Sequence, residues 1–299
     1  MNNNLLSQKP LFDAYVTQGP RTLSSYSFVP VFAWADFFDF EFKVMNEALC
    51  VFAHHAPGCF LYIPPLNSNL DLATAEECFA YMAKTSKAKG VARIENIPEN
   101  LLKVFRQGQY NLFTKPAEYV YRKADLAAFK GNAYKSQRHD CNYFSAHYGN
   151  HAFVPYADEY LNECLSLYAH WAAKRALANT DAIYRSMLED NCLVHERLMT
   201  HWQALGLIGR VLKVDGRIVG YTFGYPLDDQ TFCVYIEVTD LSIKGAAAYL
   251  FNRFCSDEKL QPFSLINTMD DFAMPNVARA KQAYHPDQMI ISYVALTGD

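Results

Sequence analysis

The second half of the chain has the clearest pattern of hydrophobic and polar positions. Apolar residues recur three to four positions apart over 156–177, which is the spacing of a helix with one buried face. A second helix is predicted from a cap at Asn179-Thr180-Asp181 to about Trp202. The rest of this half predicts, in chain order, strands over 208–214, 218–225 and 231–238, a helix over 245–254, a strand over 263–267, a helix over 275–284 and a strand over 288–296.

The first half gives nearly the same order. Its predicted elements are helices over 10–17 and 27–38, strands over 40–45, 49–54 and 59–63, a helix over 74–87, a strand over 92–94, a helix over 98–106, a strand over 110–114, an extended segment over 119–122 and a helix over 132–147. No residue-level repeat connects the halves, but the recurring order predicts a duplicated α+β unit, with an N-terminal domain over 1–150 and a C-terminal domain over 151–299.

Composition and charge narrow the class of protein. The 299 residues are 51% hydrophobic and 19% charged, which excludes disorder and a long coiled coil. A formal net charge of −4 provides no global basic field, so any contact with nucleic acid must come from a local patch. The eight cysteines form no Cys-x-x-Cys pair, residues 1–10 lack the features of a signal peptide, and no segment is apolar enough to span a membrane. We therefore expect a soluble, cytoplasmic protein.

The predicted order of elements resembles that of the Gcn5-related N-acetyltransferases (GNATs). The resemblance implies an α+β fold of two tandem GNAT-like domains (the acyl-CoA N-acyltransferase fold), each a mixed, mostly antiparallel sheet flanked by helices. In that unit the acyl donor lies where the central strands splay, and its phosphates meet the N-terminus of the next helix. Free backbone N–H groups and the helix dipole favour an anion at such a position.

The corresponding segment in this chain is 235–249. The GNAT pattern Gln/Arg-x-x-Gly-x-Gly/Ala appears as Ser242-x-x-Gly245-x-Ala247, so its leading residue differs. Gly245 would permit close approach of the donor, and a nearby lysine would add charge. The candidate donor-binding residues are Ser242, Lys244, Gly245, Ala246 and Ala247. The alternative is an ordinary connection from a strand to a helix with a face of small residues.

Two acidic residues are candidates for the general base. Glu237 lies in an otherwise apolar strand, where burial would raise its pKa towards the working range. Asp240 follows the end of that strand. The alternatives are that Glu237 points to solvent and that Asp240 caps a helix near Ser242.

The end of the last predicted helix adds groups that can carry or release protons. Lys281 and Tyr284 lie three positions apart, so one helix face presents an ammonium and a phenol, and His285 follows before Pro286 ends the helix. A phenol can reprotonate a leaving thiolate, and a histidine titrates near neutral pH. Asn267 and Arg279 from the same third of the chain are candidate substrate-binding residues. The alternative is a solvated helix C-terminus, where cations are favourable in any case.

A local basic cluster occupies 130–144. Its candidate substrate-binding residues are Lys130, Lys135, Arg138 and Asn142. They could bind a phosphate, a carboxylate or an RNA backbone, or they could form a solvated helix face. The pairs His147/His151 and His195/His201 lack further ligands, so no metal is predicted, and the chain contains no Walker loop or Gly-x-Ser-x-Gly elbow.

Several of these motifs together resemble an uncharacterised bacterial family related to the C-terminal domain of phosphatidylglycerol lysyltransferases. The motifs are Lys130-Gly131-x-x-Tyr134-Lys135-x-x-Arg138-x-x-x-Asn142-x-Phe144, Ser242-Ile243-Lys244-Gly245-Ala246, Arg279-x-Lys281-x-x-Tyr284-His285-Pro286, Tyr26-Ser27-Phe28 with Trp34, and Tyr62-Ile63-Pro64-Pro65. The resemblance spans nearly the whole chain. It implies tandem GNAT-like domains, as in the Fem-type peptidyl transferases, and relatives that move an aminoacyl group from aminoacyl-tRNA to an amine or a lipid hydroxyl. It also implies that nine motif residues lie around one cleft: Lys130, Lys135, Arg138, Asn142, Lys244, Gly245, Lys281, Tyr284 and His285.

These observations predict an acyl or aminoacyl transferase whose acceptor is an amine or a hydroxyl group of a small molecule or a peptide. The donor would be aminoacyl-tRNA, bound through the local basic patch, or acyl-coenzyme A, and neither would be a permanently bound cofactor. The alternative is a catalytically silent GNAT-like protein that binds a small ligand or a partner. The identity of the acceptor and the oligomeric state stay open.

Overall fold

The computed structural model describes residues 5–87, 90–179 and 181–298. Thr180 of the predicted cap and the first four residues of the N-terminal segment lie outside this range. The chain forms two compact units, which are described separately below. Unit 1 comprises Met1–Glu118, Asp270–Pro275 and Met289–Asp299, and unit 2 comprises Tyr119–Met269 and Asn276–Gln288. The predicted division of the duplicated fold at residue 150 stays a prediction.

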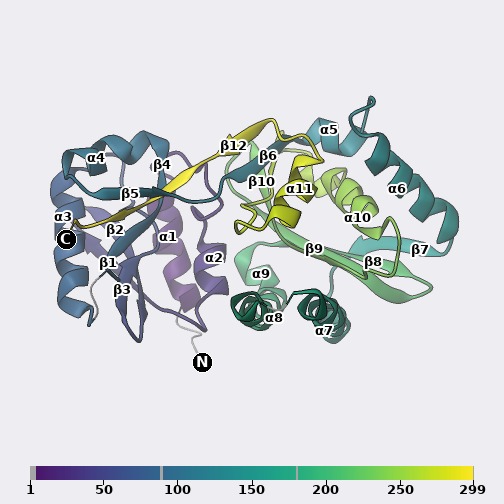
Figure 1. The fold of residues 1–299 in the computed structure, drawn as a ribbon, viewed down its shortest axis with the longest axis horizontal. Coiled ribbons are helices and arrows are strands. Elements are labelled where there is room, and N and C mark those ends of the chain that lie inside the picture. Colours follow the sequence, from purple (N-terminus) through teal and green to yellow (C-terminus); the bar gives the residue numbers. More distant parts are fainter. Residues whose placement is uncertain (1–4, 88–89, 180, 299) are drawn as a thin grey trace. The chain divides into compact units, whose positions relative to one another are not determined.

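Unit 1 is built on a six-stranded sheet with the order β1-β2-β3-β4-β13-β5 (Figure 1). Its elements are η1 (Leu5–Gln8), α1 (Lys9–Val16), α2 (Phe28–Ala33), β1 (Asp39–Met45), β2 (Ala48–His55), β3 (Gly58–Leu61), α3 (Leu72–Thr85), β4 (Arg93–Pro98), η2 (Glu99–Leu101), α4 (Leu102–Gln107), β5 (Asn111–Thr114) and β13 (Ser292–Leu296). Asn46 and Glu47 both have positive φ, so they form the two-residue turn that joins β1 to β2. Asp71 accepts a hydrogen bond from the backbone N–H of Thr74 and caps α3.

Unit 2 is built on a seven-stranded sheet with the order β12-β6-β11-β10-β9-β8-β7. Its elements are β6 (Glu118–Arg122), α5 (Lys123–Ala128), α6 (Lys135–His147), β7 (His151–Pro155), η3 (Asp158–Tyr160), α7 (Leu161–Ala178), α8 (Ala182–Thr200), α9 (Trp202–Leu205), β8 (Ile208–Val214), β9 (Arg217–Pro226), β10 (Thr231–Thr239), α10 (Ala246–Cys255), η4 (Glu258–Leu260), β11 (Leu265–Asn267), α11 (Pro275–Gln282) and β12 (Gln288–Ile290). The sequence did not indicate strand β7 or helix α5.

Helices cover both faces of the unit 2 sheet (Figure 1). On one face, His195 of α8 lies 2.7 Å from the hydroxyl of Tyr221 in β9, and burial lowers the pKa of this histidine to about 3. On the other face α10 packs so closely that a Cβ placed on Gly220 would lie 3.2 Å from Leu250. The aromatic core beneath α10 includes Phe232 and Phe254.

The two sheets share one plan but are not built from consecutive segments. In each sheet antiparallel strands lead to one parallel pair, β3 with β4 in unit 1 and β10 with β11 in unit 2. The strand beside that pair comes from a distant part of the chain. β13, at the end of the sequence, lies between β4 and β5, whereas β6, which precedes most of unit 2, lies between β11 and β12. The predicted strand 288–296 is accordingly divided into β12 and β13.

Candidate functional site

The parallel strands of unit 2 separate just before the predicted donor segment. β10 pairs with β11 only from Thr231 to Cys233, although β10 continues to Thr239 alongside β9. A register shift between Val234 and Ile236 marks a bulge at the point of separation. A bulge next to the end of a parallel pair changes the direction of the side chains that follow it. The opened part of β10 carries Glu237.

The structure places the Glu237 carboxyl group in a buried setting. Thr222 of β9 is the residue opposite Glu237 across the strand pair and is fully buried. Burial raises the pKa of Glu237 to about 8. The carboxylate oxygen Oε2 and Thr222 Oγ1 are buried without a hydrogen-bond partner among the described residues. A buried acid of this kind has the pKa that a general base needs near neutral pH.

Tyr284 lies close enough to Glu237 for the charge of that carboxylate to affect its hydroxyl. Its ring packs against Phe129 and Phe251, with centroid distances of 5.9 Å and 5.1 Å. Burial raises the pKa of the Tyr284 hydroxyl well above its usual value, and the charge of Glu237 raises it further. Cys141 is a third member of this environment, and burial raises the pKa of its thiol to about 12. The phenol therefore stays protonated at neutral pH.

Hydrogen bonds from the rest of unit 2 fix the chain around Tyr284. The hydroxyl of Tyr134 donates to the Tyr284 carbonyl over 3.1 Å, and Gln137 Nε2 donates to the Ala283 carbonyl over 2.6 Å. The Tyr121 hydroxyl donates to the Lys281 carbonyl over 2.9 Å. These donors bind carbonyl groups at the end of α11, where the helical hydrogen-bond pattern stops; the Lys281 carbonyl also accepts from Tyr284 N over 3.0 Å. The sequence did not single out Thr222, Gln137 or Tyr121, because only the strand register and the tertiary packing bring them here.

Three other predicted residues of the C-terminal motif are placed differently from Tyr284. Lys281 Nζ donates to the carbonyl groups of Thr268 and Met269 over 2.5 Å and 3.2 Å. His285 has positive φ, and its Nε2 lies 3.1 Å from the Ala133 carbonyl oxygen. Arg279 is exposed. Lys281 thus holds the segment that follows β11, and its catalytic role stays a prediction, as does that of His285.

Asp240 forms part of a tight turn. Its Oδ1 accepts hydrogen bonds from the backbone N–H and the hydroxyl of Ser242, over 2.9 Å and 2.7 Å, and lies 3.5 Å from Lys174 Nζ. Burial raises the pKa of Asp240, but the Ser242 hydrogen bonds and the Lys174 charge lower it more, so the net direction is down. An ionised carboxylate whose Oδ1 is already bound to Ser242 and Lys174 is a weaker candidate for the base than Glu237.

The predicted donor loop is packed against helix α6. Gly245 has φ +83° at the start of α10, and a Cβ at this position would clash with the carbonyl oxygen of Asp140 and lie 3.1 Å from the Cβ of Phe144. The ammonium of Lys244 lies 4.3 Å from the centre of the Tyr143 ring. Ala246 is buried and Ala247 is exposed. The close approach at Gly245 is therefore made by α6, and donor binding by this loop stays a prediction.

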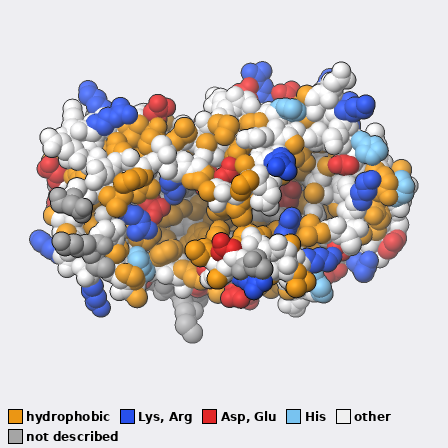
Figure 2. Space-filling view, in the orientation of Figure 1, with side chains coloured by type: hydrophobic (Ala, Val, Ile, Leu, Met, Phe, Trp, Pro, Cys, Tyr) orange, Lys and Arg blue, Asp and Glu red, His pale blue; other side chains and the backbone are white. Residues whose placement is uncertain are grey.

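The residues of the predicted basic patch differ in their contacts, and their role in substrate binding stays a prediction. Arg138 donates to the carbonyl groups of Phe129 and Gly131, and so fixes the turn before α6. Lys130, Lys135 and Asn142 are exposed. Asn267 is fully buried at the end of β11, and its Oδ1 accepts a hydrogen bond from Met269 N over 2.7 Å. Lys and Arg side chains are scattered over the face shown in Figure 2.

Two further properties concern the described residues as a whole. No helix among them combines the length and apolar character needed to cross a membrane. Within residues 5–87, 90–179 and 181–298, no three His, Cys, Asp or Glu side chains are grouped so that they could hold a metal ion.

The fold defines the class of protein. Two mixed, mostly antiparallel sheets, each with a parallel pair and flanking helices, make a tandem of GNAT-like domains. A tandem GNAT protein from the clavulanic acid biosynthesis pathway superposes with a TM-score of 0.55 and 12% identity, covering 100% of this chain and 96% of that one. A conserved protein of unknown function from Bacteroides thetaiotaomicron superposes with a TM-score of 0.85 and 24% identity, covering 98% and 97%. The structure of L-PGS from Bacillus licheniformis has a TM-score of 0.68 and 16% identity, covering 96% and 91%.

The sequence identifies the family within this class. The model of the family described as "Phosphatidylglycerol lysyltransferase, C-terminal" matches residues 17–296, so the chain belongs to that family. This confirms the resemblance indicated by the sequence motifs. No curated protein matches the chain in a sequence comparison.

Proposed function

We propose that this protein is an acyl or aminoacyl transferase in which Glu237 removes a proton from the attacking acceptor. Membership of the lysyltransferase family supports transfer chemistry, and the GNAT-like fold supports direct attack on an activated acyl group. The buried Glu237 carboxyl, with a pKa of about 8 and a free oxygen beside Thr222, is the observation that carries the proposal. An amine or hydroxyl nucleophile must lose a proton during attack, and a base with this pKa can accept it near neutral pH.

The proposed reaction balances without a cofactor. The nitrogen or oxygen of the acceptor forms a bond to the carbonyl carbon of an ester or thioester, and Glu237 takes the proton of the acceptor. The bond from the carbonyl carbon to the leaving oxygen or sulfur then breaks, and its electron pair leaves with that atom. Tyr284 is held protonated in the environment of Glu237, and its hydroxyl supplies a proton to the leaving group. Glu237 afterwards returns its proton to Tyr284, directly or through water.

Two donors fit this chemistry. An aminoacyl-tRNA ester would use the exposed Lys130 and Lys135, and its binding would weaken steeply with salt because phosphate contacts release counterions. An acyl-coenzyme A thioester would place its phosphates near Lys244 at the start of α10. A titration of the protein with each donor at about 50 and 200 mM salt separates them. Steep salt dependence with tRNA supports the first donor, and stabilisation by millimolar coenzyme A supports the second.

The test of the proposal is the substitution Glu237→Gln. Purified wild-type protein is incubated with radiolabelled acetyl-coenzyme A or with a charged tRNA mixture, in the presence of a panel of amines and alcohols. Loss of the base should reduce transfer by about 10²- to 10⁴-fold. In the wild type, kcat/KM should rise with pH and level off above a pKa near 8, because only the ionised carboxylate accepts a proton.

Glu258→Gln is the matched control, because Glu258 is an exposed glutamate of the same unit. It should transfer like the wild type. Full activity of Glu237→Gln, or activity that does not depend on pH between 6 and 9, would overturn the role of Glu237.

A catalytically silent binding protein is the second candidate function. The observation in its favour is that the loop before α10 is occupied by internal contacts, from Asp240 to Ser242 and from Gly245 to helix α6. This candidate predicts that a donor raises the unfolding temperature without any turnover. Detectable transfer by the wild type that Glu237→Gln abolishes would eliminate it.

A further inference from the structure

One face of the unit 1 sheet carries both charged and apolar side chains where β4, β13 and β5 lie side by side (Figure 1). Residues that stand opposite each other in paired strands point to the same face of a sheet. Arg93 of β4 stands opposite Leu296 of β13, which in turn stands opposite Asn111 of β5. Two residues earlier in β13, Val294 stands opposite Phe113 of β5. This face therefore combines the guanidinium of Arg93 with a row of apolar side chains.

These side chains are accessible from solvent. Phe113 is 56% exposed, and Val294 and Leu296 are partly buried. The side chains of Arg93 and Lys115 are 28% and 27% exposed. A small molecule in solution can therefore contact both the charged and the apolar groups of this face.

Two cations share one carboxylate here. Arg93 Nε donates to Glu95 Oε1 over 2.7 Å, and Lys115 Nζ donates to Glu95 Oε2 over 3.1 Å. Burial raises the pKa of Glu95, but Lys115 and Arg93 lower it more, so the carboxyl group is ionised at neutral pH. Burial, Arg93 and His54 all lower the pKa of the neighbouring His55, so its ring is neutral. Two cations and one carboxylate leave one positive charge in excess.

The two cations do not use all of their hydrogen-bond donors. Arg93 Nη1 donates to the Val91 carbonyl over 3.2 Å, and Lys115 Nζ donates also to Asn96 Oδ1 over 2.9 Å. Within the described part of the chain, no acceptor binds Arg93 Nη2 or the third hydrogen of Lys115 Nζ. The guanidinium lies 4.0 Å from the centre of the Phe60 ring, which holds it in place. The unused donors can bind the oxygens of a second carboxylate.

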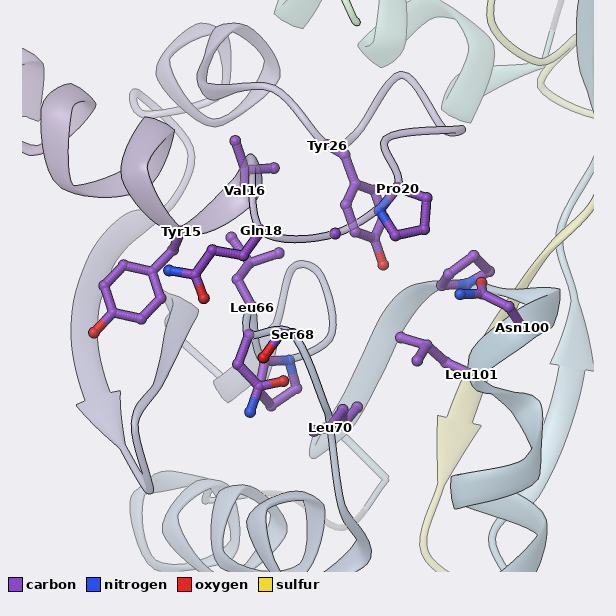
Figure 3. Close-up of a pocket in the computed structure, with 14 residues that line it drawn as sticks. Tyr15, Val16, Gln18, Pro20, Tyr26, Leu66, Ser68, Leu70, Asn100 and Leu101 are labelled. Carbon is purple, nitrogen blue, oxygen red and sulfur yellow. The ribbon is translucent and has the colours of Figure 1, made fainter.

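A cavity in the same unit is a poorer site for an anion. It measures about 120 Å³ and is lined by residues of α1, of the loops after α1 and β3, and of the segment after β4 (Figure 3). Its described lining residues include no Lys, Arg, His, Asp or Glu. An anion would find no counter-charge there, so the charges of unit 1 favour the sheet face.

From these observations we infer that the face formed by β4, β13 and β5 is a binding site for an aliphatic monocarboxylate. The carboxylate of the ligand binds Arg93 and Lys115, and its alkyl chain packs on Val294 and Phe113. The single excess charge matches a monoanion, and the same cations already bind one carboxylate, that of Glu95. The inference does not depend on transferase activity, because no residue of the unit 2 site takes part.

The test compares three probes. Hexanoate and hexanamide have the same shape but differ in charge, and acetate carries the charge without the chain. Binding of each probe to the full chain is measured by saturation-transfer NMR titration at pH 7 in a buffer of low ionic strength. We expect hexanoate to bind with a Kd on the order of 1–10 mM and the other two to bind at least about tenfold more weakly, because each lacks one of the two contacts. Absence of hexanoate binding, or equal binding of hexanamide or acetate, would overturn the assignment.

Variants of the charged residues locate the carboxylate of the ligand. Lys115→Gln should weaken hexanoate binding about three- to tenfold, whereas Lys103→Gln should bind like the wild type. Lys103 is the matched control because it is an exposed lysine of α4 in the same unit. Glu95→Gln should tighten binding about threefold, because it removes the carboxylate that competes for the two cations. Weaker binding by Glu95→Gln, or unchanged binding by Lys115→Gln, would contradict the inference.

Phe113→Ser tests the apolar contact and decides the question if Lys115→Gln does not fold, because Phe113 lies on an edge strand and is more than half exposed. It should weaken hexanoate binding about threefold. Val44→Ser is the matched control, since Val44 is 50% exposed on β1, at the other edge of the same sheet. Equal binding by these two variants would show that the alkyl chain does not lie on this face. Glu237→Gln should bind hexanoate normally, so the result is independent of the proposed transfer reaction.

Discussion

At the residue scale, the surroundings of Glu237 favour the neutral, protonated form of its carboxyl group. Glu237 stands opposite Thr222, and neither side chain completes its hydrogen bonds among the described residues. Burying a carboxylate without a cation is unfavourable, so the proton binds more tightly than in water. Such an arrangement lowers the stability of the folded state and is characteristic of functional sites.

This setting predicts how Glu237→Gln changes stability with pH. The wild-type carboxyl has a folded pKa of about 8, against a usual value near 4.5, so the folded state binds its proton over a range in which the unfolded state has lost it. The stability contributed by this group is complete below about pH 4.5 and is lost as the pH rises through 8. The variant has no such group, so it should be more stable than the wild type at pH 8, by an amount on the order of a few kcal/mol.

Urea denaturation of both proteins at pH 5 and pH 8 measures the effect. The difference in unfolding free energy should be small at pH 5 and large at pH 8. Glu258→Gln should show no such pH dependence, because Glu258 is exposed. A difference that is the same at both pH values would mean that Glu237 is solvated in the folded protein.

At the element scale, the contact between α6 and α10 explains why a glycine starts α10. The left-handed φ of Gly245 favours glycine, and the Asp140 carbonyl of α6 occupies the position that a side chain would need. A phosphate-binding loop would also need a left-handed φ and free space at this position. The sequence pattern alone therefore could not show whether helix α6 or a bound ligand approaches Gly245.

Gly245→Ala should therefore lower the free energy of unfolding more than a Gly→Ala substitution at a site with the same φ but no close neighbour. Gly131 is the matched control, because its φ is +82° and nothing lies within 4 Å of a Cβ placed there. Gly131→Ala should cost about 1 kcal/mol, from the backbone alone. Gly245→Ala should cost about 2–4 kcal/mol, because α6 must also shift. Urea denaturation measures both, and equal effects would show that α6 does not press on this position.

Local patterns predicted the elements well where a short segment determines the structure. The Asp215-Gly216 turn forms as predicted, with both residues at positive φ, and Val214 pairs with Arg217 across it. Glu237 lies on a strand as predicted. Its partner Thr222 could not be predicted, because the bulge at 234–236 sets which residues face each other. The carbonyl groups that bind Lys281 and Arg138 likewise have no signal in the sequence.

At the scale of the whole molecule, each sheet incorporates a strand from a distant part of the chain. β13 pairs with β4 and β5 in unit 1, and β6 pairs with β11 in unit 2. Periodicity identifies such segments as strands but carries no information about their neighbours. The recurring order of elements therefore predicted two similar sheets. Which sheet β13 and β6 each join could be learned only from the structure.

Unit 1 should accordingly depend on the last residues of the sequence. Ala295 of β13 is fully buried between Ile94 of β4 and Leu112 of β5. Ala295→Asp places an unpaired charge in the sheet, which should destabilise unit 1 by about 3 kcal/mol or more. Hydrogen exchange should accelerate in β4 and β5, more than 170 residues away in sequence.

The exposed Thr297 provides the control, since Thr297→Asp adds the same charge just beyond β13 and should leave exchange unchanged. The strands β8 and β9 of unit 2 provide an internal reference, because β13 does not pair with them. Exchange that accelerates only at the end of the chain would mean that β13 can detach while the rest of the unit 1 sheet persists. Acceleration in β4 and β5 would instead show that the C-terminal strand is an integral part of that sheet.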